Sequence, residues 1–590
     1  MAKRTSAQRD LEPVLQETES SSEEDDEEAS EWEYKEATEF ESDTADKPDL
    51  KRRPRKSPKT VEQDAPQQPE QRPGEIFMSR KGQIEWSSSP KIAQPRSPTK
   101  LKMKPGPTRM AVSRVHDIRS AFELFISDSI QQVVLNMTNL EGKRIISKKW
   151  KEVDNTEMFA YYGILILAGV YKSRSQSVGS LWDSEMGRPI FRASMPLGNF
   201  HMLSRSVRFD EWATRHERRQ KDKLAEIQPV WDKWVEQLPL MYNPGPNVTV
   251  DERLVAFKGR CPFRQYMQSK PKKYGIKIWA ACDAASAYGW NMQIYTGKVK
   301  GGISEKNQGT RVVLDMTQGL SGHNITCDNF FTSYNLGQEL LKRNMTMVGT
   351  VRHNKPELPP ELLTVKDREV TSSQFAFTAN TTLVSYVPRK GKNVMLMSTL
   401  HREGQISDRE DKKPEIILHY NATKGGVDTL DMVTARHSCK KTTLRWPLVV
   451  FFNMLDISAY NAFVIWLALN PNWEKTKPRM RRRLFLDELG RALVFPHIQR
   501  SEKLPRAPGA AALTRKILEK AAETSGAECN PPVPTDAADG GKRGRCQECP
   551  RSDDSKTRSI CAYCKKYICS KHTVKQCPAC LADRSKKQKK

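Results

Sequence analysis

The order of strand and helix signals between residues 248 and 352 constrains the fold of this chain more than any other feature. Three β-rich runs separated by turn signals come first, at 248–257, 274–283 and 290–299. A helical pattern, a strand, a second helical pattern and a short strand follow, at 309–320, 323–331, 333–344 and 345–352. Alternating apolar residues bounded by turn residues are typical of strands. Three antiparallel strands followed by helix, strand, helix and strand is the order of a ribonuclease-H-like fold, so we predict an α/β multidomain protein with such a core at 247–353.

Two helical regions flank this core. Apolar residues at helical spacing predict an all-helical domain at 113–246, and helices return after the core at 438–500. The apolar run at 448–469 is long enough to span a bilayer but contains four polar residues, Asn453, Asp456, Ser458 and Asn461. Because these groups would be costly in hydrocarbon, we expect a buried helix of a soluble, intracellular protein with no membrane contact.

The core is interrupted before its last helix. Residues 354–415 are more polar and irregular, and 386–401 have the pattern of a β-hairpin that turns around Gly391. We therefore expect a β-rich insertion at 354–415, after which 416–437 supply the last helix of the core.

Both ends of the folded part differ from it in composition. Residues 1–112 combine an acidic run (20–28) with a basic, proline-rich stretch (51–59), and such blocks of charge at low hydrophobicity predict a disordered tail. The basic stretch fits a nuclear localisation signal or a phosphate contact, and the alternative for the segment is a plain solubilising tail. Residues 501–544, with Pro, Gly and Ala, are predicted to be a linker.

The balance of charge indicates the kind of partner. The chain has 97 Lys and Arg against 71 Asp and Glu, which gives a net charge of +26. This excess favours a polyanion, with nucleic acid the first candidate and a membrane surface the second. A solvated basic surface without a partner is the alternative.

Four aspartates occupy positions that favour a metal site. Asp251 lies among alternating apolar residues of a predicted strand, Asp328 lies near the end of another, and Asp428 and Asp431 share one helix face. A buried carboxylate is costly unless it is paired or binds a cation. Carboxylates from two strands and a helix can hold two Mg²⁺ ions, which activate water and stabilise the leaving oxygen in phosphodiester cleavage. The alternative for each aspartate is a turn or capping residue, and for Asp428 a first-turn acid that interacts with the helix dipole.

Residues 546–580 contain four pairs of Cys or His residues, each pair separated by two residues. The pairs are Cys546 and Cys549, Cys561 and Cys564, Cys569 and His572, and Cys577 and Cys580. Eight such ligands fit two tetrahedral Zn²⁺ sites, so 545–590 is predicted to be a zinc domain that needs its metal to fold. Pairing of consecutive pairs, or crossed pairing of the first with the third and the second with the fourth, fits the spacing equally. Cys529 is left unpaired.

Four sequence blocks resemble those of the piggyBac family of DDE/D DNA transposases. They are NVTVDERLVAFKGR (247–260), TCDNFFTSYNL (326–336), KGGVDTLDMV (424–433) and RWPLVVFFNML (445–455), in the family's order. The resemblance runs from about 115 to 470 and returns in the Cys/His module. It implies that Asp251, Asp328 and Asp428 are the catalytic acids, that Asp431 is an accessory metal ligand, and that Mg²⁺ or Mn²⁺ is the cofactor.

The resemblance also implies how the chain contacts DNA. Asn329 would reach target bases, Arg352 and Lys355 would touch DNA, and Trp446 would engage the transposon end, with a core tryptophan beside a helix start as the alternative for Trp446. The helices before 246 and after 438 would form one dimerisation and DNA-binding domain. The zinc domain would recognise transposon-end DNA, and a RING-like ubiquitin ligase module is its alternative.

The function that the resemblance implies is cut-and-paste transposition in the nucleus by a homodimer. The enzyme would bind the terminal inverted repeats of double-stranded DNA, cut the 3′ ends, form hairpins by attack of the freed hydroxyls on the opposite strands, and join the reopened ends to TTAA targets. The alternative is a domesticated, catalytically silent DNA-binding descendant. The presence of all four aspartates argues against that alternative.

Overall fold

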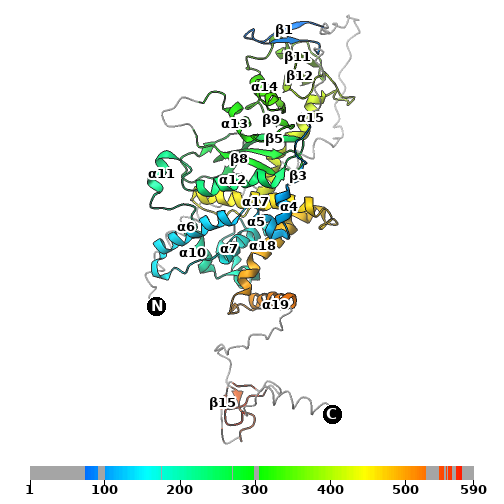
Figure 1. The fold of residues 1–590 in the computed structure, drawn as a ribbon. Coiled ribbons are helices and arrows are strands. Elements are labelled where there is room, and N and C mark those ends of the chain that lie inside the picture. Colours follow the sequence, from blue (N-terminus) through cyan, green and yellow to red (C-terminus); the bar gives the residue numbers. More distant parts are fainter. Residues whose placement is uncertain are drawn as a thin grey trace, which may run out of the picture. The chain divides into compact units, whose positions relative to one another are not determined.

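The structure is a computed structural model of the chain. It describes residues 74–90, 100–174, 176–268, 270–297, 305–525, 544–550, 553, 556–557, 559–560 and 566–573. The chain divides between Leu518 and Glu519 into two compact units, which are described separately below (Figure 1).

A mixed sheet organises the first unit, and its centre contains the strands predicted between residues 248 and 352. β5 (Asn247–Ala256), β7 (Tyr274–Asp283) and β8 (Gly289–Ile294) form an antiparallel meander. β9 (Asn324–Cys327) pairs in parallel with β5, and β10 (Thr346–Thr350) pairs in parallel with β9. Helix α13 (Gln308–Met316) precedes β9, and α14 (Tyr334–Lys342) precedes β10. The strands and helices predicted for 248–352 are therefore present in the predicted order.

Apolar burial explains why these segments adopt their structure. The side chains of Val248, Val250 and Ile325 are fully buried at the centre of the sheet, where β-branched residues pack well. Helix α14 begins at an N-cap, Ser333, whose hydroxyl accepts a hydrogen bond from the backbone N–H of Leu336.

The predicted insertion extends the same sheet. β11 (Ser373–Phe377), β12 (Thr382–Arg389) and β13 (Lys392–Ser398) are antiparallel neighbours, and β13 pairs with β10. The predicted hairpin turns at Gly391, whose φ of +74° favours glycine. The insertion is thus β-rich, as expected.

The prediction of a disordered tail over 1–112 is wrong for residues 74–90 and 100–112. β1 (Ile76–Met78) and β2 (Glu85–Ser87) form a hairpin that joins the sheet through β11 (Figure 1). Trp86 is fully buried and donates its indole N–H to the carbonyl of Glu357 at 3.0 Å. Each of these strands has only three residues, which is too short to show a hydrophobic period in the sequence. The hairpin is therefore ordered by tertiary packing. Residues 1–73 lie outside the described residues.

Helices before and after the core pack together, as predicted. Those before it are α4 (Arg109–Arg114), α5 (Ile118–Glu123), α6 (Asp128–Ile146), α7 (Asn155–Val170), α8 (Val178–Leu181), α9 (Pro189–Ser194), α10 (Leu197–Ser206), α11 (Arg215–Lys221) and α12 (Gln228–Met241). Those after it are α17 (Trp446–Leu469) and α18 (Arg481–Gln499). Helices α7 and α18 approach so closely at Gly163 that a Cβ there would lie 2.8 Å from the carbonyl oxygen of Gly490. The two helical regions, distant in sequence, therefore share one core.

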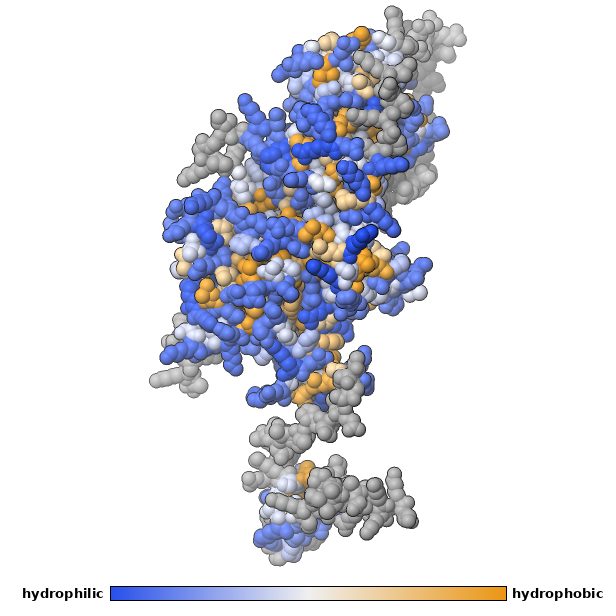
Figure 2. Space-filling model, in the orientation of Figure 1, coloured by the Kyte–Doolittle hydropathy of each residue, from blue (hydrophilic) through white to orange (hydrophobic). Residues whose placement is uncertain are grey.

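Helix α17 is long and apolar enough to cross a membrane, and 72% of its most apolar window is buried inside the structure. Its polar residues have protein partners. Ser458 accepts a hydrogen bond from the indole N–H of Trp234 at 2.9 Å, and Asn461 exchanges two hydrogen bonds with the backbone of Gly289. On the face shown in Figure 2, hydrophilic residues cover much of the first unit. These contacts agree with the predicted buried helix.

Part of the predicted linker at 501–544 is helical. α19 (Pro508–Ser525) occupies it, and its Ala510 and Ile517 are buried. Short strands also occur outside the main elements, namely β3 (Gly106–Pro107), β4 (Tyr242–Asn243) and β6 (Gln265–Tyr266), and in the second unit β14 (Gly544–Arg545) and β15 (Lys556–Thr557).

Candidate active site and zinc cluster

Two of the four predicted acids meet at the end of the parallel pair β5 and β9. The last paired residues are Val250 and Cys327, so Asp251 is the next residue of β5 and Asp328 directly follows the last residue of β9. Glu252 joins them, and one carboxylate oxygen from each of the three lies within 4.8 Å of the others. The sequence reading missed Glu252, because neighbouring residues of a strand point to opposite faces. Its only signal was its position beside Asp251.

Burial and like charge shape the ionisation of this acidic group. Burial raises the pKa of Asp251 to about 7, and the charges of Glu252 and Asp328 add to the rise against the backbone N–H of Glu252 and the ammonium of Lys270. The pKa of Asp328 is also raised, first by burial and then by Glu252, while the backbone N–H of Phe330 acts in the opposite direction. Carboxylates that destabilise one another in this way favour a bound cation. Their oxygen donors suit Mg²⁺ or Mn²⁺.

The other two predicted acids lie on α16 (Gly426–Arg436) and have basic partners. Asp428 is in the first turn, its side chain is 69% exposed, and its Oδ1 lies 3.8 Å from the Nζ of Lys270. Asp431 accepts a hydrogen bond from the guanidinium of Arg253 at 2.5 Å. Among the described residues, neither belongs to the group formed by Asp251, Glu252 and Asp328. The expected convergence of four acids is therefore seen for two of them.

The first turn of α16 is nevertheless held against β5. A Cβ on Gly426 would lie 2.6 Å from the Oγ1 of Thr249, so only glycine permits this approach. Thr249 in turn donates its hydroxyl to the carbonyl of Thr423 at the end of α15 (Glu415–Thr423). Gly426 thus lets the helix of Asp428 approach the strand that carries Asp251.

Three of the four residues expected to touch DNA lie near the acidic group in sequence or space. Asn329 follows Asp328, is exposed, and accepts a hydrogen bond from the Nε of Arg352 at 3.0 Å. Arg352 is exposed as well. Lys355 lines a cavity of about 370 Å³ together with Phe330 and Tyr334.

The fourth residue, Trp446, lies in the core. Its side chain is 4% exposed and packs edge-on against Phe263, with ring centroids 4.9 Å apart. In this structure it does not present its ring to a ligand, and the alternative of a core tryptophan beside a helix start holds. The reason is that Trp446 begins the apolar helix α17, whose first turns are buried.

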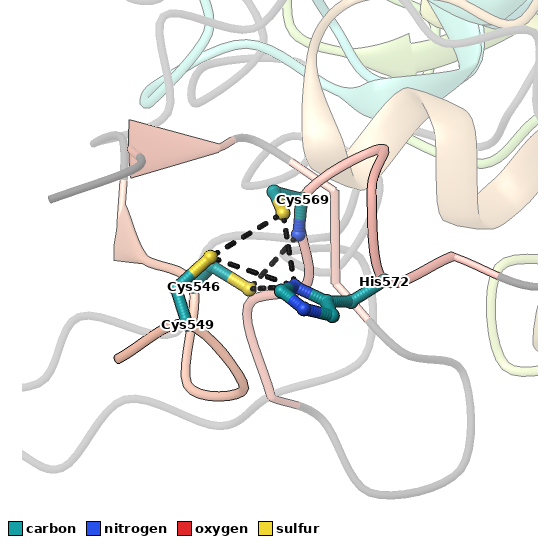
Figure 3. A group of neighbouring side chains, drawn as sticks. All are labelled: Cys546, Cys549, Cys569 and His572. Atoms are coloured by element: carbon teal, nitrogen blue, oxygen red, sulfur yellow. Dashed lines mark hydrogen bonds between the residues drawn. The ribbon is translucent and has the colours of Figure 1, made fainter. Parts of the chain in front are cut away.

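Four of the eight predicted zinc ligands gather in the second unit (Figure 3). They are Cys546, Cys549, Cys569 and His572. The Sγ atoms of Cys549 and Cys569 are 3.6 Å apart, and the Nδ1 of His572 lies 3.3–3.7 Å from the three sulfurs. Tetrahedral zinc with bonds of about 2.3 Å to sulfur requires edges of about 3.7 Å, so the donors fit Zn²⁺. The first and third pairs therefore lie together, as in crossed pairing.

The backbone also favours the thiolate form of Cys546. Burial alone would raise the pKa of Cys546, but it falls to about 6 because the backbone N–H groups of Cys569 and Glu548 point at the sulfur. Thiolate is the form that binds metal. The remaining predicted ligands, Cys561, Cys564, Cys577 and Cys580, lie outside the described residues, as does Cys529.

Comparisons with known proteins agree with the fold and the sequence blocks. A family model described as Transposase IS4 matches residues 118–463, more than half of the chain. PiggyBac transposable element-derived protein 3 of Homo sapiens is 21% identical over 365 residues, which cover 57% of this chain and 60% of that protein. PiggyBac transposable element-derived protein 2 of Homo sapiens is 23% identical over 391 residues, or 60% of each chain. The chain thus spans about 60% of the length of these relatives.

A solved structure is also similar over most of the chain. The cryo-EM structure of the piggyBac transposase synaptic complex with hairpin DNA has a TM-score of 0.67 and 31% sequence identity, and the match covers 81% of this chain and 100% of that one. The mixed α/β sheet with its packed helices is common to both. Together with the family match, this similarity shows that the chain belongs to the piggyBac family of transposases.

Proposed function

We propose that this protein is a cut-and-paste DNA transposase that cleaves phosphodiester bonds with divalent cations. The observation that carries the proposal is the meeting of Asp251, Glu252 and Asp328 where the parallel pairing of β5 with β9 ends, with the pKa values of both aspartates raised. The strand order β8, β7, β5, β9, β10, with Asp251 on β5 and Asp328 directly after β9, supports a ribonuclease-H-like core.

Asp251 and Asp328 would hold Mg²⁺ or Mn²⁺, with Asp428 as the third catalytic acid and Asp431 near them on the same helix. When bound, such cations acidify a water molecule and stabilise the charge on the leaving oxygen. The chain's own contribution is to place the carboxylates at fixed positions on the sheet, where geometry rather than a covalent intermediate lowers the barrier.

DNA contact would begin beside these acids. Arg352 is exposed, and its hydrogen bond to Asn329 orients the guanidinium next to Asp328, which suits contact with a phosphate. Lys355 adds a second positive charge nearby. The net charge of +26 supports a nucleic-acid partner.

The reaction sequence proposed here has four steps. Water cleaves a phosphodiester at the transposon end and leaves a 3′-hydroxyl. This hydroxyl attacks a phosphate of the opposite strand, displaces the 3′ oxygen of the flanking DNA and closes a hairpin. Water reopens the hairpin, and the 3′-hydroxyl then attacks a TTAA target in a second exchange of ester bonds. A hairpin DNA is part of the name of the similar synaptic complex. Because two transposon ends must be brought together, we propose that the protein acts as a homodimer. We propose the nucleus as its place of action.

The zinc domain would bind transposon-end DNA. Its cluster of Cys546, Cys549, Cys569 and His572 fits one structural Zn²⁺, and the four remaining Cys residues would hold a second. The basic runs at 542–545, 565–566 and 586–590 favour phosphate contacts over a ubiquitin ligase role.

Hairpin opening tests the proposal without knowledge of the terminal repeats. A synthetic hairpin with TTAA at its tip is incubated with the full chain in Mg²⁺ or in EDTA. Opening in Mg²⁺ alone, lost in Asp251→Asn and Asp328→Asn, is the expected result. Opening that persists in Asp251→Asn would contradict the assignment.

A catalytically silent DNA-binding protein is the second candidate. Two relatives are named as transposable element-derived proteins, and Asp428 is paired with Lys270 rather than grouped with Asp251. Binding of the hairpin by wild type without opening under any divalent cation would favour this candidate.

A further inference from the structure

Three acids around the proposed cation site have a basic partner on or beside the central sheet. Asp431 is paired with Arg253 at 2.5 Å, Glu252 with Lys277 at 3.6 Å, and Asp428 with Lys270 at 3.8 Å. In the part of the chain that the structure describes, no basic group lies within salt-bridge distance of Asp251 or Asp328. The charges are therefore arranged so that two carboxylates stay open to an added cation.

Lys270 differs from the other two basic partners. Its ammonium donates to the carbonyl oxygen of Glu252 at 3.2 Å and also lies 3.8 Å from Asp428. It thus joins the backbone beside Asp251 to the first turn of α16, and its charge opposes the rise in the pKa of Asp251. One ammonium therefore sits among three of the acidic residues.

The Lys270 contact is also exchangeable, whereas the Arg253 contact is not. The Arg253 side chain is 2% exposed and holds Asp431 directly. The side chains of Lys270 and Asp428 are 23% and 69% exposed, so water can replace either partner at low cost. A divalent cation placed near Asp428 would repel the ammonium, since like charges a few ångströms apart are unfavourable.

We propose that Lys270 is a positioning residue of the active site, whose ammonium holds Asp428 beside β5 and gives up that carboxylate when a divalent cation binds. The inference rests on the proposed cation site at Asp251 and Asp328. Lys270 is then an internal competitor of the metal. Its ammonium keeps Asp428 close to the sheet, and it weakens cation binding until the Asp428 carboxylate leaves the ammonium for the cation.

Mn²⁺ binding to the full chain tests this role without any DNA or catalysis. Zinc-saturated protein is titrated with MnCl₂, free Mn²⁺ is read by electron paramagnetic resonance, and the binding that Asp251→Asn removes is assigned to the site. Lys270→Met is expected to lower the Kd of that site by about tenfold, because it removes the competing charge. Lys270→Gln is a second neutral variant with the same expectation.

Two controls separate position from net charge. Lys273→Met removes one charge from an exposed residue of the same loop and should leave the Kd unchanged, and Lys270→Arg, which keeps the charge, should bind no tighter than wild type. The double variant Lys270→Met/Asp428→Asn should lose the gain, since the gain acts through Asp428. Equal Kd values for wild type and both neutral variants would overturn the role of Lys270 and leave the cation site standing. Absence of any Mn²⁺ binding that Asp251→Asn removes, in wild type and neutral variants alike, would overturn both.

Discussion

The guanidinium of Arg253 on β5 donates to the carboxylate of Asp431 on α16 at 2.5 Å. The Arg253 side chain is 2% exposed and that of Asp431 is 35% exposed. A second guanidinium nitrogen lies 3.4 Å from the Oγ1 of Thr434, one turn further along the helix. This contact fastens the helix that carries Asp428 to the strand that carries Asp251, so in this structure Asp431 serves as the anchor of that helix.

The anchor predicts that Asp431 and Asp428 differ in their effect on stability. Asp431→Asn leaves the charge of Arg253 buried without an anion, and loss of one partner of a buried pair costs about 3–5 kcal/mol. We expect about 3 kcal/mol, because Asp431 is partly exposed. Asp428→Asn alters a solvated pair and should change the free energy of unfolding by less than about 1 kcal/mol. Denaturant unfolding of both variants in EDTA measures the difference, and equal losses would contradict the anchor.

The raised pKa of Asp251 predicts a pH-dependent stability difference. The folded protein binds this proton more tightly than the unfolded chain, whose aspartate pKa is about 3.9. The stabilising contribution is therefore complete below about pH 4 and is lost as pH rises through about 7. Asp251→Asn does not ionise, so in EDTA its Tm should exceed that of wild type by a margin that grows from pH 5 to 7 and then levels off. A constant difference in thermal scans over this range would refute the shift.

Addition of Mg²⁺ should reverse that order at pH 8. A cation bound to the folded protein raises its Tm by mass action, and Asp251→Asn removes a ligand. Wild type should gain stability with MgCl₂ in the same thermal scans, while Asp251→Asn should not. An equal gain in both proteins would place the cation elsewhere.

Crossed zinc pairing can be distinguished by counting metal in a double variant. If Cys546 and Cys561 belong to different sites, Cys546→Ser with Cys561→Ser should lose both zinc ions. Consecutive pairing would place both residues in one site and leave one ion bound. The number of zinc ions is measured with a metallochromic dye after denaturation releases them. Cys546→Ser/Cys569→Ser is the matched control: crossed pairing places both residues in one site, so this variant should lose one ion.

The position of Trp446 predicts a stability effect rather than a DNA-binding effect. Trp446→Ala should destabilise the first unit by about 3–5 kcal/mol, as for other buried aromatic residues. The milder Trp446→Phe should keep the wild-type Kd for hairpin DNA in fluorescence anisotropy, whereas Arg352→Ala should raise that Kd about fivefold or more. A weakened Kd in Trp446→Phe alone would show that the ring reaches DNA after a rearrangement.

The sequence predicted the centre of the fold well because its signals there are local. Strands β5, β7 and β8 alternate apolar residues between turns, and Asp251 and Asp328 interrupt or follow such runs. Parallel pairing of β5 with β9 then brings these two aspartates together. Residue pattern and strand order are sufficient for that inference.

The parts that the sequence did not predict depend on contacts distant in the chain. Glu252 belongs to the acidic group because Asp328 follows β9 beside the middle of β5, and Lys270 reaches Asp428 from a loop 158 positions earlier (428 − 270). The hairpin of β1 and β2 is ordered by the burial of Trp86 against Glu357 and Tyr334. None of these relationships leaves a period or a spacing in the sequence.

Anomalous diffraction at the manganese edge tests the central claim most directly. Crystals of the full chain soaked in MnCl₂ should show a peak within bonding distance of carboxylate oxygens of both Asp251 and Asp328, and the peak should vanish in Asp328→Asn. A map with no peak at these two residues, or with a peak unaffected by Asp328→Asn, would contradict the account.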